Sequence, residues 1–270
     1  MDYGSIVSDA AGYAKTALVK NPVTWLIFII CSLPFALIQF VVDPKKITAV
    51  MIGGTINWEL IPWPQLIVLC LAGILLMFVV SGYLVRVYRG TTPPPVFDSW
   101  GTLFLDGIKL VVVGILWFIP GMIAIAAALA LTIFGTHNVS APVGPMLGAG
   151  FLLFLIGLIL LVIAILYGIL GSVRFARTGS IREGIRFSAI TDTIQAIGWG
   201  SYILALVILV VLAPLLFSVI ISLLALIPLV GWVIQLILNP LISIFSARFI
   251  CRVYDHSIPQ APAPEPAPVA

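Results

Sequence analysis

Residues 82–109 read GYLVRVYRGTTPPPVFDSWGTLFLDGIK and join two long apolar stretches of the chain. The first stretch ends with two arginines, Arg86 and Arg89, which are followed by the proline cluster Pro93–Pro95. The prolines end one helix, and the amphipathic segment Val96–Asp106 begins the approach to the next apolar stretch. The same plan of apolar helix, basic end, break and surface segment recurs before and after this joint, so it organises the whole chain.

The composition places the chain in a membrane. Of its 270 residues, 62% are hydrophobic and 9% are charged, whereas a soluble domain carries roughly 25% charged residues. So few charges cannot cover so much apolar surface in water, and we therefore expect an all-α protein with lipid as its solvent. The net charge of +3 is small and scattered, and we expect no nucleic-acid partner.

Six apolar runs follow an N-terminal segment at residues 1–21. In that segment Ile6, Ala10 and Tyr13 recur at helical spacing, which predicts a surface helix that ends before Pro22. Each run is near the ~20 residues that a membrane-spanning helix needs, and the first run, longer than a signal-peptide core, is expected to stay in the protein. The runs are Val23–Val42, Pro64–Val85, Ile108–Phe134, Met146–Val173, Ser201–Ala225 and Leu229–Phe249.

The fifth and sixth runs are joined without any charged residue. One very long helix is therefore an alternative to two spans. Pro228 and Gly231, together with a combined length of about two spans, favour a tight hairpin. We expect a domain of six spans at residues 1–257 and a disordered Pro/Ala-rich tail at 258–270, which is SIPQAPAPEPAPVA when read from Ser257.

The basic residues predict the orientation of the chain. If the N-terminus is inside, eleven of the thirteen Lys and Arg are inside and only Lys45 and Lys46 are outside. Because cytoplasmic loops carry the excess of Lys and Arg, we predict a multi-pass protein of the plasma membrane with both termini cytoplasmic.

An internal repeat is predicted from the ends of the runs. Runs two, four and six end in arginine pairs, and runs one, three and five each contain one proline: Pro34, Pro120 and Pro214. Each odd run follows an inner surface segment, and the third of these, Ser180–Ile197, begins with a capping box made by Ser180 and Glu183. We predict three parallel units of surface helix plus transmembrane hairpin. Their bounds are 1–89, 90–177 and 178–257.

The joint at residues 82–109, followed by LVVVGILWFIPG, resembles the signature of a largely archaeal membrane family. That family is catalogued as domain of unknown function four-thousand-and-thirteen. NPVTW at the start of run one and ARFICRVYDHS near the C-terminus are also similar to it. The loop differs, because TTPPPVF stands where a Gly-rich joint with one proline is expected. The resemblance implies six helices and a membrane location, and it brings no catalytic or binding residues.

Two sets of residues are candidates for a function. The arginines on the inner face would contact anionic lipid headgroups, although topology alone also explains their positions. Polar residues in runs five and six would line a cavity for a small solute, or would form hydrogen bonds between helices. The headgroup candidates are Arg86, Arg89, Arg174, Arg177, Arg182 and Arg186. The cavity candidates are Gln235, Asn239, Ser243, Ser218 and Ser222.

No catalytic signature is present in the sequence, and we predict that the protein is not an enzyme. There is no GxSxG, HExxH or P-loop motif, and the three cysteines are scattered along the chain. We therefore expect no cofactor and no metal site. Asp98, Asp106 and Asp192 lie in the surface segments, where they are interpreted as helix caps or solvated charges.

The function indicated by these features is a structural or assembly role that organises lipid or partner proteins. Membrane lipids and other membrane proteins are the expected partners, and the sequence does not fix the oligomeric state. The alternative is a channel or transporter for a small neutral or amphiphilic solute. A packed contact at Gln235 and Asn239 would favour the structural role, and a water-filled cavity there would favour transport.

Overall fold

The computed structural model describes residues 1–41, 61–137, 143–212, 215 and 230–258. Within these ranges the chain is helical, and five helices are long and apolar enough to cross a membrane. In the same ranges a sixth span is counted only if the bent pair Phe187–Ile197 and Trp199–Val211, which turns by 95°, is taken as one. The five are α2 (Pro22–Val41), α4 (Trp63–Tyr88), α5 (Trp100–His137), α6 (Val143–Thr178) and α11 (Val230–Asp255).

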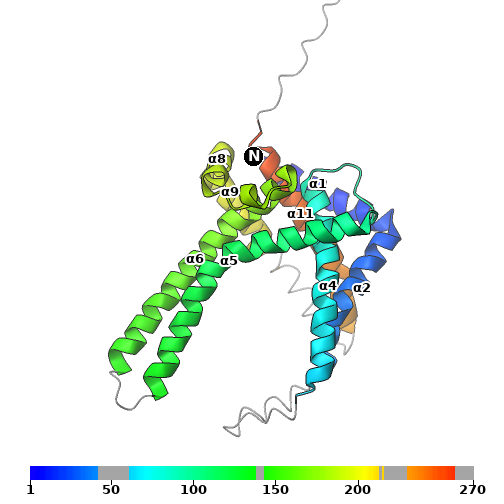
Figure 1. The fold of residues 1–270 in the computed structure, drawn as a ribbon. Coiled ribbons are helices and arrows are strands. Elements are labelled where there is room, and N and C mark those ends of the chain that lie inside the picture. The colour runs from blue at the N-terminus through cyan, green and yellow to red at the C-terminus, as the bar shows by residue number, and fades with distance from the viewer. Residues whose placement is uncertain (42–60, 138–142, 213–214, 216–229, 259–270) are drawn as a thin grey trace, which may run out of the picture.

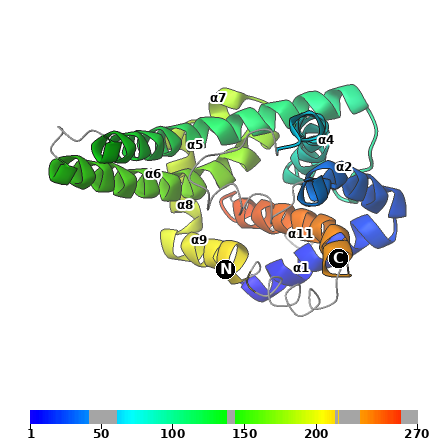
Figure 2. The ribbon, with the colours of Figure 1, turned by 90° about the horizontal axis from the view of Figure 1, so that it is seen from below.

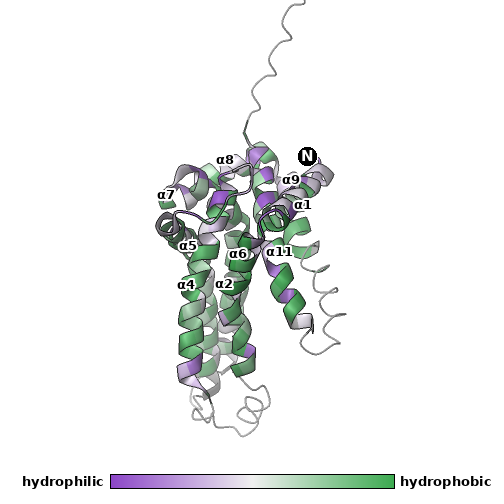
Figure 3. Cartoon of the chain, turned by 90° about the vertical axis from the view of Figure 1, so that its right-hand side faces the viewer, coloured by the Kyte–Doolittle hydropathy of each residue, from purple (hydrophilic) through white to green (hydrophobic). Residues whose placement is uncertain are grey.

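The shorter helices gather at one end of the long ones, together with the N-terminus (Figure 1). Hydrophilic residues are also concentrated at this end, whereas the long helices are hydrophobic along most of their length (Figure 3). The short helices are α1 (Tyr3–Val19), α7 (Ile181–Gly184), α8 (Phe187–Ile197) and α9 (Trp199–Leu206), and a π-helical turn at Val207–Leu212 follows α9. We call this end the charged face, since the charged side chains described below lie on it.

The first surface helix is confirmed. The Asp2 carboxylate accepts hydrogen bonds from the backbone N–H groups of Gly4 and Ser5, which caps the start of α1. Its apolar stripe, which includes Ile6 and Tyr13, is buried, and α1 packs along α11 (Figure 2). Propensity contributes little to so short a helix, and this packing supplies most of its stability.

The prediction of a separate surface helix at Val96–Asp106 is wrong. One continuous helix, α5, begins at Trp100 and runs through Gly107 into the apolar stretch. Gly107 allows α5 to cross α4 closely, because a Cβ atom on it would lie 1.8 Å from the Phe78 carbonyl oxygen. A Cβ on Gly82 of α4 would likewise lie 1.8 Å from the Leu103 carbonyl oxygen. The two glycines therefore serve the helix crossing and do not break the chain.

The third surface segment also differs from the prediction. Two helices, α7 and α8, replace the single helix expected at Ser180–Ile197, and they are separated at Ile185 and Arg186. The Ser180 side chain makes no capping hydrogen bond, and the Glu183 carboxylate accepts hydrogen bonds from arginines instead. Charge-assisted hydrogen bonds are stronger than a neutral cap, so they determine where Glu183 points.

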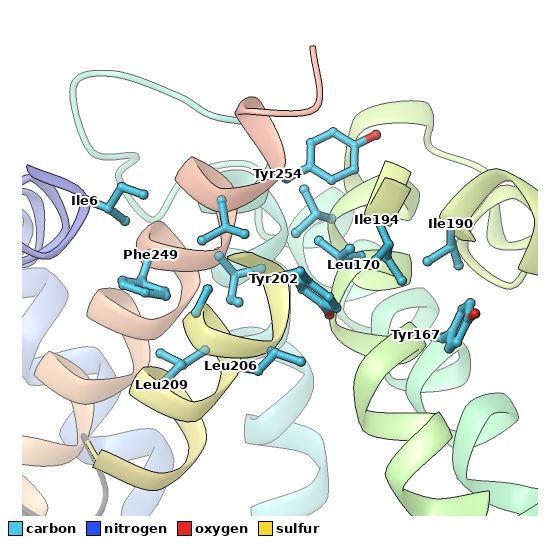
Figure 4. Packing of buried hydrophobic residues seen from close by; sticks show 14 of the residues in the cluster. Ile6, Tyr167, Leu170, Ile190, Ile194, Tyr202, Leu206, Leu209, Phe249 and Tyr254 are labelled. Carbon is cyan, nitrogen blue, oxygen red and sulfur yellow. The ribbon is translucent and has the colours of Figure 1, made fainter. Parts of the chain in front are cut away.

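The largest buried cluster joins the surface helices to the long ones at the charged face. Tyr167 and Leu170 of α6, Ile194 of α8, Tyr202 of α9 and Phe249 of α11 meet there (Figure 4). The α5–α6 hairpin extends away from this cluster on one side, and α2 and α4 lie on the other (Figures 1 and 2). Many buried side chains therefore lie beside the charges, whereas the outer halves of the hairpin expose apolar side chains such as Met122 and Phe151.

The two described prolines of the odd runs, Pro34 and Pro120, lie inside unbroken helices. Figure 1 shows that α5 changes direction along its length. Pro214 and the 258–270 tail beyond Ile258 lie outside the described residues.

Candidate functional site

Each of the three helices α4, α6 and α11 ends at the charged face with two arginines, and the first arginine of each pairs with an acid on a surface segment. Arg86 binds Asp98, which precedes α5. Arg174 Nη2 lies 2.6 Å from Glu183 Oε2 of α7. The first arginine of α11 pairs with an acid of α1, since Arg248 Nε donates a hydrogen bond to Asp9 Oδ2 at 2.8 Å.

The second arginines of α4 and α6 tie the ends of the long helices to one another. Arg177 Nε of α6 donates to the Tyr88 carbonyl oxygen of α4 at 2.8 Å, and its Nη2 lies 2.6 Å from Asp255 Oδ1 of α11. Arg89 Nε of α4 returns a hydrogen bond to the Ala176 carbonyl oxygen of α6 at 3.2 Å. Bonds to both a carbonyl and a carboxylate use the forked geometry of the guanidinium, which a lysine lacks.

The interpretation of two aspartates therefore needs correction. Asp98 and Asp106 were expected to be helix caps or solvated charges, but they bind Arg86 and Arg89. Asp192 is exposed, and no ion pair joins it to another residue in the described part of the chain. The spacing of Asp98 and Asp106 on the surface segment gave no sign of these partners, because the partners lie on a different helix.

Asp9 accepts hydrogen bonds from both arginines of α11. Arg252 Nη2 donates to Asp9 Oδ1 at 2.6 Å, and Arg248 binds the other oxygen. Hydrogen bonds from Arg252 and then from Arg248 lower the Asp9 pKa from 3.8 to about 2, although burial opposes this shift. Arg248 is only 4% exposed, and its guanidinium also lies 4.5 Å from the Tyr13 ring centroid. Asp9 is therefore the charge that allows Arg248 to be buried.

The depressed pKa predicts that the α1–α11 contact weakens in acid. The ionised form of Asp9 is favoured by folding, so its contribution to stability is present above pH 3.8 and is lost as the pH falls towards 2. We expect the thermal midpoint of the wild type to exceed that of Asp9→Asn at about pH 5, and the difference to shrink below about pH 3. Scanning fluorimetry in detergent measures the thermal midpoints of the two proteins at each pH. A difference that does not depend on pH would contradict the proposed role of the Asp9 charge.

The six arginines predicted to contact lipid headgroups are mostly engaged within the chain. Arg86, Arg89, Arg174 and Arg177 make the pairs described above, and Arg186 pairs with Glu183 at 3.2 Å. Hydrogen bonds from Arg174 and then from Arg186 hold the pKa of Glu183 below its usual value. Arg182 is exposed, and no ion pair joins it to any residue within the described ranges. Contact with lipid remains a prediction, for which Arg182 is now the strongest of the six candidates.

The polar stripe on α11 faces α2. Gln235 and Asn239 line a cavity of about 360 Å³ together with Ser32 and Gln39 of α2. Ser218 and Ser222 of run five, the other residues predicted to line this cavity, lie outside the described residues. Ser243 lines an adjoining cavity of about 200 Å³. The sequence therefore located one wall of this site.

Ser32 and Gln39 were missed as candidates. They are seven residues apart, which is close to two helical turns, so both lie on one side of α2. A serine and a glutamine in an otherwise apolar run are the signal that could have identified this wall.

The fold and these contacts define a multi-pass helical membrane protein whose long helices are joined at one end by an ionic network. The chain belongs to the family described as Protein of unknown function (DUF4013), whose model matches residues 65–229. The match includes the whole joint at residues 82–109 and confirms the family resemblance noted in the sequence. No curated protein and no solved structure matches the chain significantly.

Proposed function

We propose that the protein is a non-catalytic membrane scaffold that organises lipids, and through them partner proteins, at its charged face. The observation that carries this proposal is the set of basic side chains that the ionic network leaves exposed. Lys15, Lys20, Lys109 and Arg182 are exposed there, and no ion pair joins them to other residues in the described ranges. A Lys or Arg near a membrane surface contributes about 1 kcal/mol to the binding of anionic lipid.

The orientation and the repeat belong to the same proposal. The charged face is cytoplasmic, with both termini on that side of the plasma membrane, since cytoplasmic loops carry the excess of Lys and Arg. The six spans form three parallel units at 1–89, 90–177 and 178–257. The ion pairs support this order, because the first arginine of the pair near the end of each unit binds an acid near the start of the next. Arg248 of the third unit binds Asp9 of the first, which is what a closed ring of three units requires.

Arg182→Gln tests the lipid-binding role. We expect the variant to bind phosphatidylglycerol about fivefold more weakly than the wild type, because one surface cation contributes about 1 kcal/mol. Native mass spectrometry of the purified protein with added lipid measures the change, with phosphatidylcholine as the uncharged comparison. Asp192→Asn is the matched control, since it changes the net charge without touching a basic residue. Unchanged binding by Arg182→Gln would contradict the proposal.

A second candidate function is a channel or transporter for a small neutral or amphiphilic solute. The specific observation in its favour is the polar cavity between α2 and α11. Among the described residues this cavity is lined by uncharged side chains, which fits an uncharged solute and argues against coupling to a proton.

A further inference from the structure

The cavity between α2 and α11 lies at the depth of the hydrocarbon. Asn239 is nine residues from Arg248 at the charged face, which is about 14 Å along a helix, or roughly half of the ~30 Å apolar core. Gln235 lies one turn farther from the charged face. Gln39 lies near the far end of α2, which ends at Val41. The polar lining therefore extends from near the midplane towards the opposite side of the membrane.

The polar groups that line the cavity are only partly satisfied by the protein. Ser32 Oγ donates to the Ile29 carbonyl oxygen at 2.9 Å, and Gln39 Nε2 donates to the Ala36 carbonyl oxygen at 3.1 Å. Each bond is to the residue's own helix and leaves the side-chain oxygen free to accept. No hydrogen bond joins the amide groups of Gln235 and Asn239 to another described residue, although both side chains are exposed.

Such groups require a hydrogen-bonding occupant. An unsatisfied polar group removed from water costs about 1–3 kcal/mol, and lipid chains offer no partner. Leaving two free amides and two side-chain oxygens against hydrocarbon would therefore cost several kcal/mol of free energy, on the order of 1–3 kcal/mol for each group. The volume of about 360 Å³ is sufficient for several waters or one small solute.

The chemistry of the lining restricts what that solute is. Amide groups offer both donors and acceptors, and the hydroxyl of Ser32 accepts while it donates to its helix. The cavity is lined by no Lys, Arg, His, Asp or Glu among the described residues, so an ion would have no countercharge there. The adjoining cavity of about 200 Å³ shares Ser32, Phe35 and Asn239 and continues the space between apolar walls such as Met77.

We propose that this cavity is a hydrated binding site for a small uncharged solute that carries hydroxyl or amide groups, entered from the side opposite the charged face. Gln39 and Ser32 on α2 and Gln235 and Asn239 on α11 are its binding residues. The inference rests on the second candidate function and specifies its substrate class. The scaffold role does not depend on it.

Hydration is tested by a cysteine at position 32. Ser32→Cys is placed in a Cys31→Ala, Cys70→Ala background, which retains the buried Cys251 and all three lining amides. The control is Ile30→Cys, two residues away on the opposite side of α2, where Ile30 is 47% exposed. Methanethiosulfonate reagents react with a hydrated, ionised thiol. We expect the cysteine at position 32 to react at least about tenfold faster than the one at position 30, and equal rates would overturn the proposal.

The solute class is tested on the same reporter in proteoliposomes. Glycerol or urea should slow labelling at position 32 by about threefold or more, whereas dextran, which is too large for the cavity, should not. Adding Asn239→Leu or Gln39→Leu should remove the protection. If labelling is fast but neither glycerol nor urea protects, the site holds water only and the solute proposal is wrong.

Uptake of radiolabelled glycerol and urea separates the site from the transport function. Protection without uptake would leave the binding site standing and would contradict the second candidate function. If Asn239→Leu abolishes uptake while the thermal midpoint stays normal, the result would support both the binding site and the transport function.

Discussion

Gly107→Ala is expected to destabilise the protein by about 3 kcal/mol or more, because it forces α5 away from α4. A Cβ atom at this position would lie 1.8 Å from the Phe78 carbonyl oxygen and 2.8 Å from the Gly82 nitrogen. Both contacts are with backbone, so no side-chain rotation relieves them, and the two helices must separate. The thermal midpoint and the yield of monodisperse protein in detergent measure the loss.

Gly114→Ala is the matched control for the helix crossing. It lies on the same helix, and a Cβ there would have no heavy atom within 4 Å. Because alanine loses less backbone freedom than glycine in a helix, this change should be neutral or should stabilise by about 0.5–1 kcal/mol. Equal thermal midpoints for the two variants would show that α5 and α4 do not cross closely at Gly107.

Asp9→Ala is expected to cost about 3 kcal/mol, at the low end of the range for breaking a buried ion pair, because Asp9 itself is partly exposed. The variant leaves Arg248 buried without its carboxylate, while Arg252 reaches water more readily. Thermal unfolding measures the effect. Asp192→Ala, which removes an exposed acid that has no ion pair within the described ranges, should change the midpoint little.

A second change identifies the mechanism of the Asp9 effect. If the cost comes from a buried unpaired charge, then replacing Arg248 with methionine in the Asp9→Ala background should restore part of the stability. A double variant that is no more stable than Asp9→Ala would show that Asp9 acts through other contacts, such as those of Arg252.

The charge pattern shows how far the sequence could lead towards the candidate site. The arginines at the ends of α4, α6 and α11 were found from sequence, because a charged residue at the end of an apolar run is visible in one dimension. Their partners were not found. Arg177 binds Tyr88 and Asp255, which are 89 and 78 residues away. No local spacing encodes contacts between helices that meet only after folding.

The glycines and the polar stripe show the same limit. Gly107 resembles a helix breaker in sequence, and only the position of α4 identifies it as a crossing point. The i, i+4 spacing of Gln235 and Asn239 predicted that they share one side of a helix, since helical geometry is local. It could not predict that α2 lies opposite them, which depends on how the long helices pack.

The sequence by itself determined the membrane location, the family, the apolar runs and the surface helix α1, because each follows from hydrophobicity and spacing along one helix. The tertiary structure alone decided which acid each arginine binds, that α5 passes over α4 without a break, and that α2 and α11 enclose a polar cavity. With lipid as the solvent, the hydrophobic effect favours no particular neighbour for a long apolar helix. The choice of neighbours therefore depends on close backbone approach and on polar contacts, and these exist only once distant parts of the chain have come together.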